Sequence, residues 1–285
     1  MKLLATFPEN YELIDAGGGK KLERWGEIIT IRPEHQAYFQ AALPLNDWKK
    51  QANWEFIPEK EGALSGQWKA LNKSQQRTWE IAIENARFQL SLTSNKHLGL
   101  FPEQQTNWEF ITQFLNPSKR FLNAFAYTGA ASVIGRLTGA EVIHCDSSKS
   151  IIEWAKTNQA LSEVTGIKWV LEDALKFIQR EVKRGNKYDL IQLDPPAWGI
   201  GSNGEKWKLE EKLAELIQSS YELLHPKGVL IINTYSPKLT LEKFNKTLQL
   251  LPKSAHILSS SELWMHTVSE KSLFYGLLAR IQKIK

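Results

Sequence analysis

The hydrophobic residues of this chain follow two different periods, and the pattern changes near residue 94. Before that point apolar and polar side chains alternate over short runs, for example in residues 79–83 and 86–92. A period of two is typical of half-buried strands, so these two runs predict a strand pair. Three consecutive glycines at 17–19 separate two more runs of this type and predict a hairpin. We therefore expect a small β-rich N-terminal domain at residues 1–94.

Beyond that point short apolar runs of strand type alternate with amphipathic stretches of helical period. The strand-type runs are 120–126, 141–146, 167–173, 188–194 and 229–235, and the helical stretches are 104–115, 132–139, 150–164, 174–185, 208–224 and 239–251. Such alternation predicts a parallel sheet with helices on both faces. Two further strand-type runs, 255–265 and 273–282, have no helix between them and predict an antiparallel pair. The expected fold of residues 95–285 is α/β and Rossmann-like, with a seven-stranded, mostly parallel, doubly wound sheet.

The pentapeptide NWEFI occurs twice, at 53–57 and at 107–111. Its flanking residues differ between the two places, so it does not indicate a repeat architecture. The first copy lies in turn-rich sequence of β type. In the second, Trp108, Ile111 and Leu115 have helical spacing.

Acidic residues end three of the predicted parallel strands: Asp146, Glu172 with Asp173, and Asp194. The strand before them ends in the turn AYTGAAS, where Gly129 lets the backbone approach a ligand and the next helix offers its N–H groups. Ligands of doubly wound sheets bind at the carboxyl ends of the strands. The four strand ends therefore predict one binding site.

A nucleotide such as NAD is one ligand that this site could take. The turn has only Gly129 and then Gly135, however, and so lacks the pattern G-x-G-x-x-G. A dehydrogenase also has no need for an acid followed by two prolines, which is what Asp194-Pro195-Pro196 supplies.

Composition and charge change this picture little. The chain has 285 residues, 42% of them hydrophobic and 24% charged, as in ordinary globular proteins. It has no run of about 18 apolar residues that could span a membrane. The N-terminal apolar patch breaks at Pro8, too early for a signal peptide. The single cysteine, Cys145, excludes an internal disulfide framework and favours the cytoplasm.

The net charge is 36 − 31 = +5, which is compatible with an anionic partner such as nucleic acid. The basic groups Lys20-Lys21-Arg24 and Lys49-Lys50 could contact phosphates, but a solvated surface is the favoured interpretation of them. The six histidines have no metal-ligand spacing, so we expect no metal.

Five consecutive segments resemble motifs of the class I S-adenosylmethionine-dependent methyltransferases. They read FLNAFAYTGAAS, HCDSSKSIIEWAKTNQAL, EDALKFI, YDLIQLDPPAWG and ELLHPKGVLIINTYS. Within that class they are most similar to the bacterial 23S rRNA base methyltransferases, whose entry segment resembles HLGLFPEQQTNWEFI at 97–111. The resemblance covers residues 95–285 in order, and it implies S-adenosylmethionine as the cofactor.

The resemblance also implies roles for individual residues. Tyr127 and Gly129 would hold the methionine end, Asp146 the ribose hydroxyls, Asp173 and Ala174 the adenine, and Asp194 would lie beside the methyl group. The full set implied for the cofactor is Phe101, Gln104, Ala126, Tyr127, Thr128, Gly129, Ser132, Asp146, Ser147, Ser148, Asn158, Asp173, Ala174 and Asp194. The catalytic set is Asp194, Pro195, Pro196 and Trp198.

Physical chemistry supports these catalytic roles. Two prolines restrict the loop, an acid can accept N–H bonds from an amine, and an exposed indole can stack on a base. The simpler readings are that Trp198 packs in the core, as one of 11 tryptophans, and that Asp194 stabilises the loop or caps a helix.

Some relatives methylate carbon 5 of cytosine with a cysteine placed just after the fifth parallel strand. Here Tyr235 stands at that place, and Cys145 lies on the cofactor side. A covalent carbon mechanism needs a thiolate. We therefore expect a nitrogen nucleophile, although Ala197 separates the prolines from the aromatic residue that follows them directly in amino-methylating enzymes.

The resulting hypothesis is an RNA methyltransferase, acting on a base of ribosomal RNA. A methyltransferase for a protein or small molecule, and a non-catalytic module that only binds S-adenosylmethionine, are the alternatives. A homodimer is compatible with all three.

Overall fold

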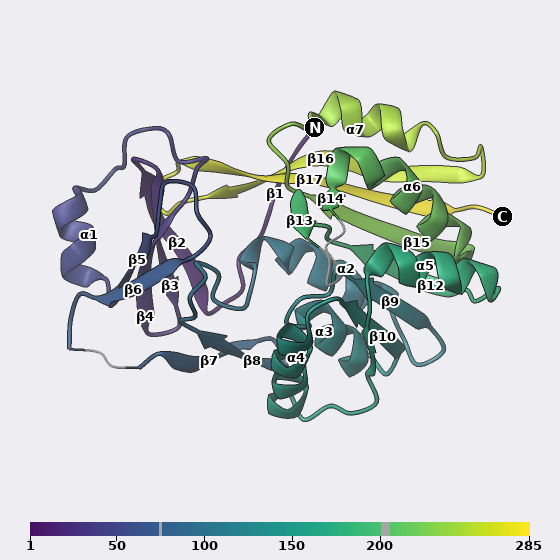
Figure 1. The fold of residues 1–285 in the computed structure, drawn as a ribbon, viewed down its shortest axis with the longest axis horizontal. Helices are drawn as coiled ribbons and strands as arrows, with labels where there is room; N and C mark the ends of the chain where they lie inside the picture. Colours follow the sequence, from purple (N-terminus) through teal and green to yellow (C-terminus); the bar gives the residue numbers. More distant parts are fainter. Residues whose placement is uncertain (74–75, 201–205) are drawn as a thin grey trace. The chain divides into compact units, whose positions relative to one another are not determined.

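The computed structural model describes residues 1–73, 76–200 and 206–285 (Figure 1). The chain divides into two compact units. One contains Met1–Leu3, Thr106–Leu263 and Tyr275–Lys285, and the other contains Leu4–Gln105 and Trp264–Phe274. We call them the α/β unit and the β-rich unit.

The strands are β1 (Lys2–Leu4), β2 (Tyr11–Gly17), β3 (Lys20–Trp25), β4 (Ile28–Pro33), β5 (Trp54–Pro58), β6 (Gly66–Ala70), β7 (Thr78–Ile83), β8 (Ala86–Ser91), β9 (Arg120–Ala124), β10 (Glu141–Asp146), β11 (Lys168–Leu171), β12 (Tyr188–Leu193), β13 (Trp198–Ile200), β14 (Lys206–Lys208), β15 (Leu224–Thr234), β16 (Ala255–His266) and β17 (Ser272–Lys283). The helices are α1 (Leu45–Gln51), η1 (Pro102–Gln104, a 3₁₀ turn), α2 (Gln105–Phe114), α3 (Ala130–Leu137), α4 (Lys149–Leu161), α5 (Ala174–Lys183), α6 (Leu209–Glu222) and α7 (Leu241–Leu248).

The large sheet has, among the described residues, eight strands in the order β1-β16-β17-β15-β12-β9-β10-β11. The strands β9, β10, β11, β12 and β15 run parallel, and β17 runs antiparallel to β15. This confirms the expected fold class. The expected count of seven strands omitted β1, which joins the edge beside β16. Its three residues are too few to show a period.

Two groups of helices flank this sheet. One group is α3 with α4, which pack against β10, and the other is α5 with α6 and α7 (Figure 1). The strand order reverses between β9 and β12, which are neighbours in the sheet. Right-handed crossovers place the helices before and after such a reversal on opposite faces, and the reversal itself marks the usual ligand site.

The β-rich unit contains a five-stranded sheet, β2-β3-β4-β5-β6, and the separate hairpin β7-β8. Both predicted hairpins are present, because β2 pairs with β3 and β7 pairs with β8 in antiparallel register. Gly18 and Gly19 turn the first hairpin at φ 58° and 76°. A side chain at Gly17 would meet the backbone of Ala41 at 2.1 Å.

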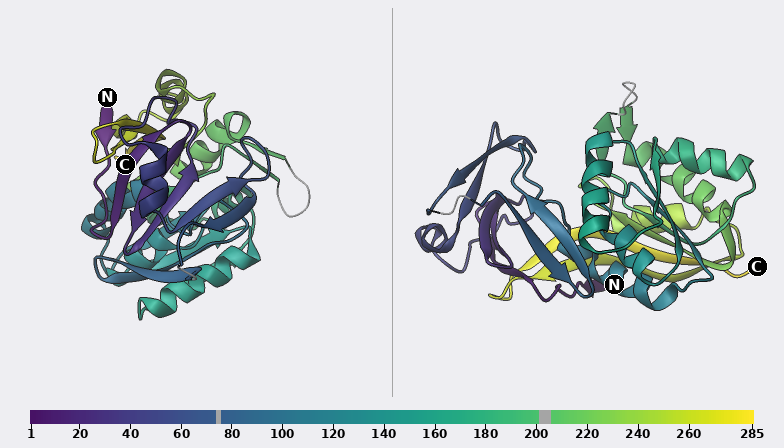
Figure 2. Two further views of the ribbon diagram at one scale, coloured as in Figure 1. Left: turned by 90° about the vertical axis from the view of Figure 1, so that its left-hand side faces the viewer. Right: turned by 90° about the horizontal axis from the view of Figure 1, so that it is seen from below.

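A segment from near the end of the chain completes the β-rich unit. The Val268 N–H donates to the Leu13 carbonyl at 2.9 Å, and the Ser269 hydroxyl donates to Asp15 at 3.0 Å. This segment joins β16 to β17, the long yellow strands in Figure 2. The β-rich unit therefore differs from a split after residue 94: it includes 95–105 and 264–274 and lacks 1–3.

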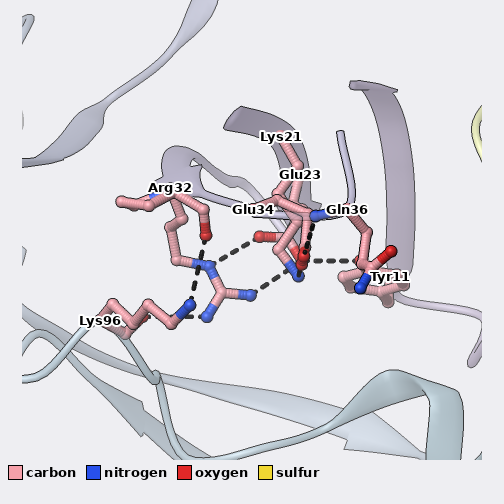
Figure 3. A network of polar contacts seen from close by, with 8 residues as sticks. Tyr11, Lys21, Glu23, Arg32, Glu34, Gln36 and Lys96 are labelled. Carbon is pink, nitrogen blue, oxygen red and sulfur yellow. Dashed lines mark hydrogen bonds and ion pairs between the residues drawn. The ribbon is translucent and has the colours of Figure 1, made fainter. Parts of the chain in front are cut away.

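A buried ionic network lies inside the β-rich unit (Figure 3). The carboxylate of Glu23, which is fully buried, accepts from Arg32 Nε and Nη2 at 2.7 and 2.8 Å and from the Tyr11 hydroxyl at 2.7 Å. Lys21 lies 3.2 Å from Glu23 and 3.5 Å from Glu34. These partners outweigh the desolvation of Glu23 and lower its pKa to about 2.

This network bears on the basic groups considered for phosphate binding. Lys21 is buried among carboxylates, Lys20 pairs with Glu55 at 2.7 Å, and Arg24 pairs with Glu12 at 3.0 Å. Lys21 is therefore shielded from phosphates, whereas Lys20 and Arg24 remain partly exposed within their ion pairs.

Candidate active site

The loop after β9 has an unusual backbone. Phe125, Tyr127 and Gly129 all have positive φ, at 56°, 51° and 83°. For the two aromatic residues this conformation is costly, and such strain is found where a loop has a binding or catalytic role. The loop leads directly into α3, whose N-cap is Gly129 and whose first N–H groups therefore have no side-chain cap. The result is a cradle of backbone donors at a strand end.

Gly129 is required by its surroundings as well as by its φ angle. A Cβ there would lie 3.1 Å from the Ala155 side chain and 3.4 Å from the ring of His144. The neighbouring Thr128 carbonyl accepts a 2.8 Å hydrogen bond from Asn158 of α4. Asn158 is fully buried, so this hydrogen bond holds the loop in place from inside the unit.

Asp146, at the end of β10, joins this loop to the next one. Its carboxylate accepts from the N–H groups of Tyr127 and Ser148, both at 2.9 Å. Burial raises the pKa of Asp146, and backbone hydrogen bonds from Ser148, Tyr127 and Ser147 oppose that rise. Asp146 thus orders two loops at a strand end, and its carboxylate oxygens have lone pairs for further hydrogen bonds. It therefore suits a ligand that carries hydroxyl groups.

A polar chain lies beneath the cradle. Asn123 donates to the Ser132 hydroxyl at 2.9 Å, and that hydroxyl lies 3.0 Å from His144 Nδ1. Burial lowers the pKa of His144 to about 3, so the ring is neutral. The fully buried Ser132 hydroxyl supports the loop from inside the unit, and its predicted contact with the cofactor stays a prediction. The role of His144 could not be predicted, because a lone histidine inside a strand gives no signal.

The third strand end carries Glu172 and Asp173. Glu172 accepts from Arg180 Nη1 at 2.8 Å, while Asp173 accepts from the Lys176 N–H at 2.9 Å. Asp173 therefore caps α5. Ala174, the first residue of that helix, is buried.

The fourth strand end lies beside the first two. Leu193 of β12 and Cys145 of β10 both pair with Ala124 of β9, so the residues that follow them, Asp194 and Asp146, emerge at one edge of the sheet. Trp198, after the two prolines, is 58% exposed. The core-packing explanation of Trp198 is therefore wrong.

Trp207 is a further residue that the sequence analysis missed. Its indole Nε1 donates to the Pro196 carbonyl at 2.6 Å, and its ring lies 5.2 Å from the ring of Phe125. It thus contacts both the loop after β9 and the loop after β12. A short run of strand type after a glycine-rich stretch is a hairpin signal that could have indicated it.

Phe101 and Gln104, also expected at the cofactor, belong to the β-rich unit, where Gln104 is buried and lies in η1. Their contact with the cofactor stays a prediction. The other expected residues, Ala126, Ser147 and Ser148, lie in the loops after β9 and β10.

No group of three or more His, Cys, Asp or Glu residues is arranged to hold a metal ion in the part of the chain that the structure describes. No helix within those residues is long and apolar enough to cross a membrane. Cys145 is buried, and burial together with neighbouring carboxylates raises the pKa of its thiol. It is therefore unsuited to act as a thiolate nucleophile.

These strand ends fit an elongated nucleoside ligand. The cradle and the free N–H groups of α3 suit a carboxylate, and Asp146 suits a diol. The ordered loop at Asp194 borders the same edge, where an exposed indole follows it.

Comparisons with known proteins agree with this description. A family model described as S-adenosylmethionine-dependent methyltransferase matches residues 63–257. The chain is 32% identical, over 193 residues, to the ribosomal RNA large subunit methyltransferase K/L of Syntrophotalea carbinolica. That match covers 66% of this chain and 26% of the relative, so the chain spans about a quarter of its length.

Two solved structures are also similar. A SAM-dependent methyltransferase from Agrobacterium tumefaciens is 32% identical, with a TM-score of 0.91, and the match covers 100% of this chain and 94% of that one. SMU.776, a methyltransferase complexed with SAH, shares the fold at 15% identity, with a TM-score of 0.78 and coverage of 97% and 76%.

Proposed function

Because the chain belongs to the S-adenosylmethionine-dependent methyltransferases, we propose that it methylates a nitrogen atom of a base in ribosomal RNA. The observation that carries the proposal is the loop at Asp194, where an acid and an exposed indole follow a strand end beside the cofactor cradle. The similarity to a ribosomal RNA methyltransferase supports the choice of substrate.

The cofactor, when bound, supplies an electrophilic methyl group on a sulfonium. We assign the loop at Tyr127 and Gly129 to its methionine end and Asp146 to its ribose hydroxyls. Asp173 and Ala174, at the start of α5, are assigned to the adenine. The Asp173 carboxylate accepts the Lys176 N–H with one oxygen, and a carboxylate has further lone pairs with which to accept an amino group.

On the substrate side, Asp194 accepts N–H bonds from the target amine and holds it in position. Pro195 and Pro196 restrict the loop that carries this acid. Methyl transfer requires alignment of nucleophile, carbon and sulfur more than covalent help from the protein, so positioning is the main contribution of these residues. Trp198 provides a face for stacking a base.

A nitrogen target is favoured over carbon 5 of a pyrimidine. Attack at carbon requires a thiolate, and Cys145 is buried with a raised pKa. At the position after β15 where relatives carry a cysteine, this chain has Tyr235.

The test is transfer of labelled methyl from S-adenosylmethionine to 23S rRNA isolated from cells that lack the protein, followed by mass mapping of the modified nucleotide. We expect one methylated base, with the methyl on nitrogen. Asp194→Ala should retain cofactor affinity in calorimetry and lose transfer by two or more orders of magnitude, as expected when a positioning group is removed.

Three results would contradict the proposal. Labelling of protein but not of RNA would reject the substrate. Binding of the cofactor without methyl transfer to any cell fraction would show that the chain is a non-catalytic module that only binds S-adenosylmethionine. Methylation at carbon would reject the nitrogen target. We place the reaction in the cytoplasm, where a reduced, buried Cys145 is ordinary.

A further inference from the structure

The hairpin formed by β13 and β14 follows directly after the loop at Asp194 and has two different faces. Its register pairs Trp198 with Lys208, Gly199 with Trp207, and Ile200 with Lys206. Directly paired residues of an antiparallel ladder share a face, and successive residues alternate between faces. Trp198, Lys206 and Lys208 therefore lie on one face, which we call the outer face, and Trp207 lies on the other.

The chain itself occupies the inner face. There Trp207 donates to the Pro196 carbonyl and packs against Phe125, and Gly199, which has no side chain, stands opposite it. These contacts anchor the hairpin to the cofactor side of the unit. The direction in which the outer face points is therefore fixed.

The outer face is open to solvent. Trp198 is 58% exposed, and both lysines are exposed. Lys208 forms a 2.7 Å ion pair with Glu211, an exposed i,i+3 pair of the kind that contributes little. No ion pair of Lys206 occurs among the described residues. This face thus combines a largely exposed indole with two ammonium groups, one of them directly opposite the indole in the ladder.

The chemistry of this face matches a single strand of RNA. An exposed indole can stack on any of the four bases. Lysines on the same face can contact phosphates and release the counterions around them. Trp198 follows Asp194 by four residues, so this face adjoins the loop that carries the acid assigned to the target base.

We propose that the outer face of the β13–β14 hairpin binds the single-stranded RNA segment that carries the target nucleotide, with Trp198 stacking on a base and Lys206 and Lys208 contacting phosphates. The proposal rests on RNA being the substrate. It adds to that function the surface that holds the strand.

The experiment measures binding of a fluorescein-labelled single-stranded RNA oligonucleotide by anisotropy over a salt series. The test variant is the double change Lys206→Glu/Lys208→Glu. The matched control is Lys156→Glu/Lys246→Glu, since both of these lysines are exposed and form local helix ion pairs with Glu153 and Glu242. Lys208 is the N-cap of α6, where a carboxylate is well tolerated, so we expect the test variant to fold.

We expect the test variant to raise Kd more than tenfold and to reduce the slope of log K against log salt by about 1.4, the value for two phosphate contacts on a single strand. Trp198→Ala should raise Kd by about five- to 150-fold, because stacking is worth roughly 1–3 kcal/mol, and should leave the slope unchanged. Calorimetry should show wild-type affinity for S-adenosylmethionine in both variants.

Unchanged RNA affinity in the test variant, or an equal loss in the control, would overturn the proposal. The proposal would also fail if the hairpin variants kept their RNA affinity but lost the methylation of a protein. That result would assign the outer face to a protein partner. Methyl transfer by the wild-type chain distinguishes failure of the hairpin proposal from failure of the proposed function. If the wild-type chain labels 23S rRNA while the hairpin variants bind RNA normally, only the hairpin proposal fails.

Discussion

The indole Nε1 of Trp207 donates a hydrogen bond of 2.6 Å to the carbonyl oxygen of Pro196. Because the ring also packs against Phe125, this one side chain connects the loops after two neighbouring strands, β9 and β12. One of these loops forms the cofactor cradle and the other carries Asp194. The relative position of the two loops determines the alignment on which methyl transfer depends.

Trp207→Phe keeps an aromatic ring and removes the donor. A hydrogen bond contributes about 0.5–1.5 kcal/mol, so the rate of transfer should fall by about two- to twelvefold while cofactor affinity stays within twofold. Single-turnover kinetics and calorimetry measure the two quantities. Trp68→Phe is the control, since the buried Nε1 of Trp68 has no hydrogen-bond partner among the described residues. A wild-type rate in Trp207→Phe would contradict this role.

Asp146→Ala should weaken binding of S-adenosylmethionine by more than tenfold. It removes the acceptor that orders the N–H groups of Tyr127 and Ser148, and hydrogen bonds to a charged group contribute about 1.5–3 kcal/mol each. Calorimetry measures the change, with Glu153→Ala on the exposed face of α4 as the control. Equal affinity in Asp146→Ala and wild type would exclude this acid from the site.

The same carboxylate predicts a pH dependence. Burial raises the pKa of Asp146, and only its ionised form accepts all of these N–H bonds. Cofactor affinity should therefore decline on acidification at a higher pH than an ordinary aspartate would give. Asp146→Asn should show a flatter profile, and a profile identical to wild type would point to another group.

Glu23→Gln should destabilise the β-rich unit by about 3–5 kcal/mol at pH 7, because it leaves Arg32 buried without its charge partner. The folded pKa of Glu23 is about 2, below its ordinary value of 4.5. Its contribution is therefore complete above pH 4.5 and is lost as the pH falls through 2. Urea denaturation at pH 7 and pH 3 measures this. The exposed pair of Glu12 with Arg24 gives the control, Glu12→Gln, for which we expect less than about 1 kcal/mol.

Glu103 should act in the opposite direction. Burial raises its pKa to about 7, so ionisation of this group costs stability as the pH rises from 4.5 to 7. The shift corresponds to roughly 3 kcal/mol. Glu103→Gln should therefore stabilise the protein at pH 8 and leave it unchanged at pH 4. Thermal denaturation at the two pH values tests this, and equal stabilisation at both would show that ionisation is not the cause.

The sequence was sufficient to predict the α/β sheet and the acids at its strand ends, because period and strand-end chemistry are local properties. The pentapeptide NWEFI shows that a short sequence does not by itself determine secondary structure. Four of the five residues of the first copy, 54–57, lie in β5, whereas all five of the second copy, 107–111, lie in α2. In the second copy the apolar positions continue at helical spacing to Leu115, while in the first they pair with β6. Neighbouring sequence and tertiary pairing decide between the two structures.

Within the site, roles that depend on contacts distant in sequence could not be predicted. The Ser132 hydroxyl contacts His144, and Trp207 contacts Phe125, which is 82 residues earlier (207 − 125). No spacing rule connects such residues. Asp173 could be predicted as a helix cap because the capping bond joins it to Lys176, only three residues away.

The β-rich unit is built from Leu4–Gln105 together with Trp264–Phe274. During synthesis on the ribosome, more than half of the chain must therefore be translated after residue 105 before the segment that bonds to Leu13 and Asp15 emerges. The five-stranded sheet of this unit is therefore synthesised well before the segment that completes the unit, and an incompletely folded sheet is open to pairing with other chains in the meantime. Residues 1–105 expressed alone lack the segment 264–274 permanently, and with it the hydrogen bonds to Leu13 and Asp15.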